Sequence, residues 1–324
     1  MIFDEPMPLI LEDFLNYLGT IKGKSQNTVK EYYYDLRTLF RFLKIRYRFV
    51  DRNMDFDSIP IDDIDEKFID KITLQDLFAF ISYSDIKRNN SNFAKARKVA
   101  SIRSFFKYLH TIVKLVDTNP ALNLETPKTD SRQPVYLTLD ESKFLLDIID
   151  GTYKERDYAI ITLFLNCGLR ISELISIDIN KIKDDTLTVV GKGNKERTIY
   201  LNDACIDSIN RYLSVRPTEG VKDKKALFLS KRKNRISVRA VQHLVKKYME
   251  KASLDTEKYS PHKLRHTAAT LMYKYGNVDI RALQKILGHE SVSTTQIYTH
   301  IDDDRLRKAV KSNPLSNNKK DKKV

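Results

Sequence analysis

The first third of the chain carries apolar residues at the spacing of amphipathic helices. Leu11, Phe14, Leu15 and Leu18 follow one another at i, i+3, i+4 and i+7, so they share one face of a helix. Three later stripes repeat this spacing: Val29, Tyr33, Leu36, Phe40 and Leu43; then Leu74, Leu77, Phe78 and Ile81; then Val99, Ile102, Phe106 and Leu109. No alternating strand pattern interrupts them, so residues 1–117 are predicted to form a compact helical domain.

Three helix starts can be placed from the sequence. Thr28-x-x-Glu31 and Thr138-x-x-Glu141 match the capping box, in which a threonine and a glutamate satisfy each other's backbone N–H groups. A further helix is expected to begin near Thr73. The cap at Thr138 opens a second helical region, which carries Leu145, Ile148 and Ile149.

A proline-rich segment separates the two regions. Pro120, Pro127 and Pro134 lie among few apolar residues, and proline ends helices and stiffens an extended chain. Residues 118–137 are therefore predicted to be a linker. A second domain is expected over 138–313, followed by a basic tail over 314–324.

One β pattern occurs in the second domain. Leu187–Val190 and Arg197–Leu201 are rich in β-branched residues and flank the loop sequence GKGNKE, which predicts an antiparallel hairpin. Helical spacing returns after Asn202. The expected class is mainly α (α+β): a helical first domain and a helical second domain with a small antiparallel sheet.

The charge indicates a polyanionic partner. The 57 lysines and arginines exceed the 43 acidic residues, which gives a net charge of +14 and favours nucleic acid. Residues 51–76 hold nine acidic and three basic side chains, 87–107 hold seven basic and none acidic, and 222–247 hold ten basic and one acidic. This uneven charge is explained if the first domain turns a basic face toward DNA phosphates and an acidic face away from them. The alternative is that these stretches are ordinary solvated helix faces.

The sequence argues against several other classes. No apolar run approaches the roughly 18 residues of a membrane span, and the N-terminal segment lacks the pattern of a secretion signal. Cys167 and Cys205 are the only cysteines, too few for a disulfide framework or a CxxC metal site. No P-loop motif for a nucleotide occurs. We expect a cytoplasmic, nucleoid-associated protein with neither membrane nor cofactor.

The segment SPHKLRHTAAT favours phosphate binding. Ser260 and Pro261 predict the start of a helix. His262 and Arg265 then share one face of its first turn, where the helix dipole favours an anion. His262 and His266 have the spacing of a zinc pair, but a third ligand is not evident and Arg265 stands beside them. Metal binding is therefore disfavoured, and His266 is interpreted as a buried hydrogen-bonding support.

Four segments together resemble the tyrosine recombinase family, also called phage integrases, and in particular its Xer-type members. They are CGLRISEL, GKGNKER, SPHKLRHTAAT and LGHESVSTTQIYTH, in this order and spacing. The helical first domain resembles the family's core-binding domain, so the resemblance covers nearly the whole chain. The acidic stretch over residues 46–71 is longer than the compact Xer pattern.

This resemblance implies strand cleavage and rejoining at specific DNA sites. Tyr298 would attack a phosphodiester, form a 3′-phosphotyrosyl bond and free a 5′-hydroxyl, and two such exchanges would pass through a Holliday junction. No metal, cofactor or ATP would be needed. The catalytic residues that it implies are Arg170, Lys192, His262, Arg265, His289 and Tyr298.

Phosphoryl transfer explains why these residue types belong together. The phosphate gains negative charge as it is attacked, and fixed cationic donors stabilise that charge. Arg170 and Arg265 would clamp the phosphate, and His289 would donate a further hydrogen bond. His262 would accept the tyrosine proton and Lys192 would protonate the departing oxygen. Two further residues are implied as supports: Glu173 and His266.

The expected partner is double-stranded DNA with specific recombination sites, held in a C-shaped clamp. DNA contacts are expected from Lys95, Arg97, Lys98, Arg103, Arg235, Arg239 and Gln242. Arg239 and Gln242 suit base contacts. A homo- or hetero-tetramer is expected on DNA, and a helix over residues 302–311 would pack on a neighbouring protomer or on its own domain.

The biological role stays open at this point. Chromosome dimer resolution is favoured by the compact length, and integration of a mobile element or phage is the alternative. A DNA-binding protein with vestigial catalytic residues and a topoisomerase are the rivals from other classes.

Overall fold

The computed structural model describes residues 5–128, 135–191, 196–276, 278–289, 291–296 and 298. The chain divides into two compact units, residues 1–131 and 132–324, and the division falls within the segment predicted as a linker. Within the described ranges, no helix combines the length and apolar character that a membrane span requires. The predicted tail and the predicted helix over 302–311 lie outside the described residues.

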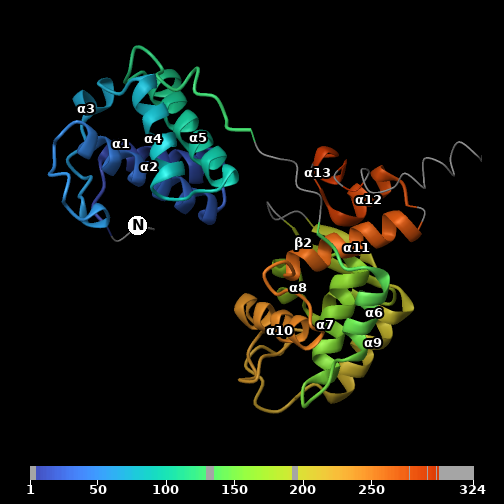
Figure 1. The fold of residues 1–324 in the computed structure, drawn as a ribbon. Coiled ribbons are helices and arrows are strands. Elements are labelled where there is room, and N and C mark those ends of the chain that lie inside the picture. Colours follow the sequence, from blue (N-terminus) through green and yellow to red (C-terminus); the bar gives the residue numbers. More distant parts are fainter. Residues whose placement is uncertain are drawn as a thin grey trace, which may run out of the picture. The chain divides into compact units, whose positions relative to one another are not determined.

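All regular elements in the described part of the first unit are helices (Figure 1). Its α-helices are α1 (Leu9–Asn16), α2 (Gln26–Arg46), α3 (Glu66–Asp70), α4 (Leu74–Ile86) and α5 (Asn92–Lys107). Two π-helical turns, η1 (Tyr17–Ile21) and η3 (Tyr108–Ile112), extend α1 and α5, and η2 (Phe56–Ser58) is a 3-10 turn. The long helix α2 packs against α1, α4 and α5, so the four predicted stripes meet in one core.

Two details of this unit differ from the sequence prediction. Helix α2 begins one turn earlier than expected, because the Ser25 hydroxyl accepts the Thr28 N–H at 3.2 Å and so takes the place of the predicted cap at Thr28. Phe78, predicted to face inward, is 47% exposed, whereas Phe80 is fully buried. The capping box at Thr73 is present with Asp76 as its carboxylate, which confirms the start of α4.

The second unit surrounds a small sheet with helices. Its helices are α6 (Leu139–Asp147), α7 (Lys154–Cys167), α8 (Ile171–Ile175), α9 (Asp203–Val215), α10 (Val238–Lys251), α11 (Pro261–Tyr275), α12 (Ile280–Leu287) and α13 (Ser293–Gln296), with the 3-10 turn η4 (Ile179–Lys181). The buried helix α7 contacts α6, α9 and α11 (Figure 1). The capping box at Thr138 opens α6 as predicted.

The sheet contains three antiparallel strands in the order β1-β2-β3. They are β1 (Ile182–Lys183), β2 (Thr186–Val190) and β3 (Glu196–Tyr200), so the predicted hairpin is confirmed, and β1 is too short to leave a pattern. Leu187 pairs with Ile199, and Val189 pairs with Arg197. The mainly α class with a small antiparallel sheet is thereby confirmed. The loop that carries Lys192 lies outside the described residues.

Candidate active site

A left-handed glycine places Arg170 at the start of α8. Gly168 ends α7 with φ 59°, a conformation that L side chains rarely adopt. A β-carbon there would lie 2.9 Å from Leu287 Cδ2, so glycine also lets the end of α7 approach the end of α12. Two residues later, Arg170 is the N-cap residue of α8.

Helix α11 delivers Arg265 into the same place. It starts at Pro261 after Ser260, as predicted, although the Ser260 side chain makes no capping hydrogen bond. The Arg265 guanidinium is buried and donates to the Gly168 carbonyl and to the Leu287 carbonyl, both at 2.6 Å. Burial, with repulsion from Arg170, lowers the pKa of Arg265 to about 10, so it remains protonated at neutral pH.

Three arginines converge on the C-terminal end of α12. Arg197 donates to the Ile286 carbonyl, Arg265 to the Leu287 carbonyl, and Arg170 to the Gly288 carbonyl at 3.1 Å. Carbonyls at a helix C-terminus have no partners within the helix and carry the negative end of its dipole. We call Arg170, Arg197 and Arg265 the arginine cluster; the helix end helps to hold their positive charges together.

Glu173 also binds the arginine cluster, in addition to the carbonyls at the end of α12. Its carboxylate is 1% exposed and accepts from the Arg170 guanidinium at 3.0 Å, the Arg170 N–H at 2.8 Å and Arg197 at 3.0 Å. Arg265 lies 3.8 Å away. Burial alone would raise the pKa of Glu173, but the Arg170 N–H and the Arg197 guanidinium keep it below its usual value. A buried, ionised Glu173 fits the orienting role predicted for it.

Arg170 is the member of the cluster that solvent reaches most easily. Its side chain is 35% exposed, compared with 15% for Arg197 and 4% for Arg265. A guanidinium has five N–H donors, and the hydrogen bonds to Glu173 and Gly288 use only some of those of Arg170. Arg170 can therefore offer donors to an anion that approaches the cluster.

His289 follows the last carbonyl of this group. Its Nδ1 lies 2.9 Å from the Thr295 hydroxyl. Burial, and repulsion from Arg265 and Arg170, lower the pKa of His289 to about 4, so the imidazole is neutral at pH 7. When the Thr295 hydroxyl donates to Nδ1, the other ring nitrogen carries the proton and can donate it to a phosphate oxygen.

Tyr298 is buried and hydrogen-bonded to histidine. Its hydroxyl lies 2.6 Å from His266 Nδ1, and His266 Nε2 lies 3.1 Å from His262 Nε2. Burial raises the pKa of Tyr298 to about 12, although the charge of Arg265 opposes this. Burial, with repulsion from His262, lowers the pKa of His266 to about 4. The phenol is therefore protonated and donates to a neutral His266, which forms a Tyr298–His266–His262 chain.

The order of these two histidines differs from the prediction. His262 was expected to accept the tyrosine proton directly, with His266 as a support. In the structure His266 contacts Tyr298, and His262 lies behind it on the more exposed side of α11. The spacing of four residues placed both on one helix face without showing which one the tyrosine meets. Among the described residues, no group of three or more histidine, cysteine or carboxylate side chains could hold a metal ion.

Arg197 is a site residue that the sequence analysis missed. It lies in the segment GKGNKER, at the start of β3, and its side chain reaches Glu173 and the end of α12. Its position could have indicated a role, because it lies on the second strand of the hairpin whose loop carries the predicted catalytic residue Lys192. Lys192, in that loop, lies outside the described residues.

The predicted DNA contacts of the first unit differ in their surroundings. Lys98 is buried and its ammonium lies 2.8 Å from the Asp35 carboxylate, so it stabilises the unit and we do not retain it as a DNA contact. Arg97 also pairs with Asp35, at 2.8 Å, and Lys95 pairs with Asp85 at 2.5 Å. Arg103 is exposed on α5.

The predicted contacts of the second unit lie at and before α10. Arg235 donates to Asp178 at 2.5 Å and to Asp223 at 2.8 Å, and it also bonds two backbone carbonyls. These contacts hold its guanidinium in place within the protein, and its predicted DNA contact stays a prediction. Arg239 and Gln242 are exposed on α10, as base contacts require.

Comparisons with known proteins agree with the resemblance in the sequence. Residues 135–305 match the model of the phage integrase family. The chain is 62% identical over 309 residues to the tyrosine recombinase XerC of Caldanaerobacter subterraneus subsp. tengcongensis, covering 95% of this chain and 88% of the relative.

Solved structures share the fold at low sequence identity. The XerH site-specific recombinase bound to palindromic difH substrate, in a post-cleavage complex, aligns with a TM-score of 0.66 at 21% identity, over 96% of this chain and 98% of that chain. The lambda integrase tetramer bound to a Holliday junction aligns with a TM-score of 0.65 at 16% identity, over 88% and 77% of the two chains.

Proposed function

The chain belongs to the phage integrase family of tyrosine recombinases, and from this premise we propose that Tyr298 is the nucleophile that cleaves the DNA strand. The protein is a Xer-like site-specific recombinase. The observation that carries the proposal is the hydrogen bond of 2.6 Å between the Tyr298 hydroxyl and His266. It supplies a proton acceptor to a buried phenol that lies beside the arginine cluster.

Arg170, Arg265 and His289 bind the scissile phosphate in this proposal. Negative charge grows on the non-bridging oxygens as the phosphorus is attacked, and donors already fixed in place stabilise it without reorganising. Glu173 and the end of α12 hold the arginines, so the site is built before substrate arrives. Arg197 is a positioning residue because its contacts are with Glu173 and the Ile286 carbonyl.

The chemical step transfers the phosphoryl group to Tyr298. The phenolic oxygen forms a bond to phosphorus, the bond from phosphorus to the 5′-oxygen breaks, and a 3′-phosphotyrosyl bond remains. The phenol proton passes to His266 Nδ1, and the proton on His266 Nε2 passes to His262. Lys192 is proposed to give a proton to the departing 5′-oxygen. Attack by a 5′-hydroxyl of the partner duplex then reverses these steps and joins the strands.

We propose that the protein exchanges strands between two duplexes through a Holliday junction, as a tetramer. The XerH and lambda integrase structures were solved with a difH substrate and with a Holliday junction. The identity of 62% to a XerC protein favours chromosome dimer resolution over mobile-element integration. A recombinase of this kind requires paired cognate sites, whereas a topoisomerase relaxes any supercoiled plasmid.

Replacement of Tyr298 tests the nucleophile. On a nicked suicide duplex that carries the cognate site, Tyr298→Phe should form no covalent adduct and should bind the duplex with unchanged affinity, because only the attacking oxygen is lost. Denaturing gel electrophoresis measures the adduct, and a shift assay measures binding. An adduct formed by Tyr298→Phe would show that another residue attacks.

We also propose that cleavage needs neither metal nor ATP. The arginine cluster and His289 provide the positive charge and hydrogen bonds that a metal ion supplies in other phosphoryl transferases. Adduct formation on the suicide duplex should therefore proceed at the same rate in excess EDTA and without nucleotide. A rate restored only by Mg²⁺ after chelation would contradict this mechanism.

A further inference from the structure

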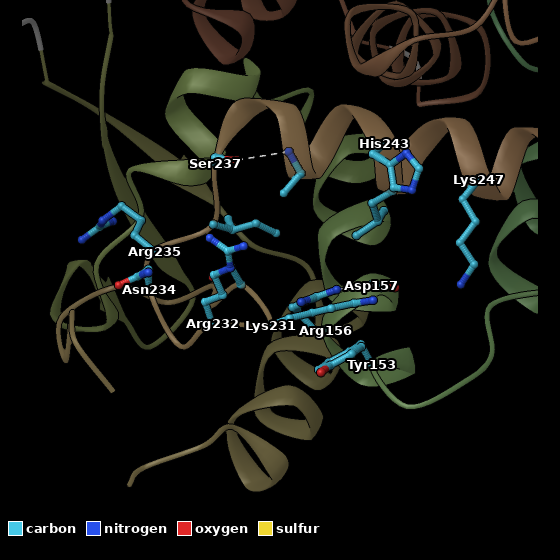
Figure 2. Close-up of a pocket in the computed structure, with 14 residues that line it drawn as sticks. Tyr153, Arg156, Asp157, Lys231, Arg232, Asn234, Arg235, Ser237, His243 and Lys247 are labelled. Atoms are coloured by element: carbon cyan, nitrogen blue, oxygen red, sulfur yellow. Dashed lines mark hydrogen bonds and ion pairs between the residues drawn. The ribbon is translucent and has the colours of Figure 1, made fainter. Parts of the chain in front are cut away.

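A basic pocket opens beside α10 in the second unit (Figure 2). Its volume is about 600 Å³, and its walls come from the start of α7, the segment over 230–237 and one side of α10. Five of the lining side chains are lysine or arginine, and Asp157 is the one carboxylate among them. The lining includes no residue of the arginine cluster or of the Tyr298–His266–His262 chain.

The Asp157 carboxylate is already saturated. It is buried; Oδ1 accepts two hydrogen bonds from Arg156, at 2.9 and 2.7 Å, and Oδ2 accepts one from the Tyr248 hydroxyl at 3.0 Å. Arg156 gives a further N–H to the Leu229 carbonyl at 3.0 Å. This pair therefore neutralises itself, and Arg235 is paired with Asp178 and Asp223. The positive charges of Lys231, Arg232 and Lys247 remain.

Lys231 and Arg232 stand on a turn that the backbone fixes. The Ser230 N–H donates to the Asn234 carbonyl at 2.8 Å, and the Lys233 N–H donates to the Ser230 carbonyl at 2.9 Å. Both Lys231 and Arg232 are exposed, and neither forms an ion pair with another described residue. We call these two side chains the basic turn; their positions are set without a carboxylate to compensate them.

Two further groups complete the wall. His243 and Lys247 reach toward the pocket from successive turns of α10 (Figure 2). The Lys247 ammonium lies 4.5 Å from the centre of the Tyr248 ring, and the Lys231 ammonium lies 5.8 Å from the centre of the Tyr153 ring. The aromatic faces support the ammonium groups and leave hydrogen-bond donors for a ligand. Such a set of donors suits the oxygens of a phosphoryl group.

We propose that the basic turn and Lys247 bind backbone phosphates of the duplex whose scissile phosphate lies at Arg170. This inference rests on the proposed function, because it takes the same duplex as its ligand. The observation that supports this inference independently is the excess of positive charge around the pocket. A polyanion is the ligand that best complements such charge.

Hydrogen bonds of Arg235 connect the pocket to the helix that carries Arg170. This connection favours a duplex that reaches both sites over a free phosphate as the ligand. Arg235, which follows the basic turn, donates to the Ile175 and Ile177 carbonyls at 3.1 and 3.2 Å. Those carbonyls lie at the end of α8, and Arg170 lies at its start. Helix α7 also runs from the pocket, where it contributes Arg156, to Gly168 beside the arginine cluster, a rise of about 18 Å at 1.5 Å per residue. That rise equals about five base-pair steps of 3.4 Å along a duplex axis.

The test measures how duplex affinity depends on salt. Each phosphate contact contributes about 0.9 to the slope of log affinity against log salt concentration. Lys231→Gln and Arg232→Gln should each lower the magnitude of the slope by about 0.9, and together by about 1.8. The matched control is Lys233→Gln in the same turn, which removes the same charge. Its ammonium donates to the Glu219 carbonyl at 2.9 Å and it does not line the pocket, so its slope should equal that of the wild type.

Any of three results would overturn the proposal. The first is an unchanged slope in both pocket variants, and the second is an equal fall of the slope in Lys233→Gln. The third is an unchanged duplex slope together with tight binding of tripolyphosphate that Lys231→Gln abolishes, which would assign the pocket to a free phosphate compound. Adduct formation by Tyr298 at saturating protein should be the same in the Lys233→Gln control as in the wild type. Wild-type protein that binds the duplex but forms no adduct would instead refute the proposed function.

Discussion

At the scale of single residues, the side chain that contacts the Tyr298 hydroxyl determines which group can accept its proton. His266 lies 2.6 Å from the phenol and is neutral because burial holds its pKa at about 4. Its other nitrogen contacts His262, which is exposed to solvent. In the proposed mechanism His266 therefore accepts the proton first, and His262 relays it outward.

Substitution of each histidine separates these two positions. His266→Asn keeps a polar group near the phenol but removes the proton acceptor, so adduct formation should slow about 100-fold or more, in the range of general acid–base catalysis. His262→Asn should slow it less, because His266 still accepts the proton. Single-turnover rates on the suicide duplex measure both. A larger defect in His262→Asn would restore His262 as the direct acceptor.

The same pKa shifts make the stability of the protein depend on pH. His266 and His289 have folded-state pKa values of about 4, below the ordinary histidine value of 6.5. Between these values the unfolded chain binds more protons than the folded one, so stability rises with pH and is fully present above about 6.5.

As the pH falls from 7 to 5, each of these histidines should cost up to about 1.4 kcal/mol of unfolding free energy per pH unit below 6.5. Urea denaturation at several pH values measures this loss. The double variant His266→Asn and His289→Asn should show a flatter dependence over the same window. A profile as steep as that of the wild type would mean that other groups govern it.

At this scale, the resemblance to the recombinase family predicted Arg170, Arg265, His289 and Tyr298, and the fold brings them together. Arg197 was not predicted, because its role depends on contacts with Glu173 and with the Ile286 carbonyl. A local sequence pattern does not reveal such contacts. The contact between Tyr298 and His266 joins residues 32 positions apart, so only tertiary packing could choose it over His262.

At the scale of elements, the site depends on where helices end. Gly168 ends α7 and Gly288 ends α12, both in the left-handed conformation, and the arginines bind the carbonyls beside these ends. Hydrophobic spacing predicted the helices well because it records which face is buried. Exact ends were harder: Ser25 competes with Thr28 as a cap, and both have a hydroxyl that can accept the N–H three residues on.

A glycine substitution tests this dependence. Gly168→Ala should cost about 1–2 kcal/mol through backbone strain alone, and its β-carbon would press on Leu287 Cδ2 at 2.9 Å. Arg265 bonds the carbonyls of Gly168 and Leu287, so cleavage should slow as well. Gly151→Ala is the control: its φ is 88° with no atom within 4 Å of the β-carbon. It should lose stability to a similar degree and cleave at the normal rate, and an equal loss of cleavage would assign the effect to stability.

At the scale of the whole molecule, the two units have separate cores. Leu36, Phe40 and Phe105 belong to the first, and Ile160, Phe164 and Tyr248 to the second. The boundary between the two units falls within the predicted linker, although Ala121 and Leu124 already belong to the first core. The C-shaped clamp remains a prediction, because it describes how the two units together hold one DNA duplex.

Removal of the first unit tests that clamp. Residues 132–324 contain the arginine cluster, Glu173 and Tyr298 with their own core, so this unit alone should unfold cooperatively and form the adduct when saturated with the suicide duplex. Its affinity should fall and its salt slope should flatten, because the predicted phosphate contacts of α5 are lost. Adding residues 1–131 as a separate chain should restore little, since the covalent link supplies a high effective concentration. If the isolated unit bound with the affinity and slope of the full chain, the first unit would not hold DNA, and the excess positive charge over residues 87–107 would be an ordinary solvated surface.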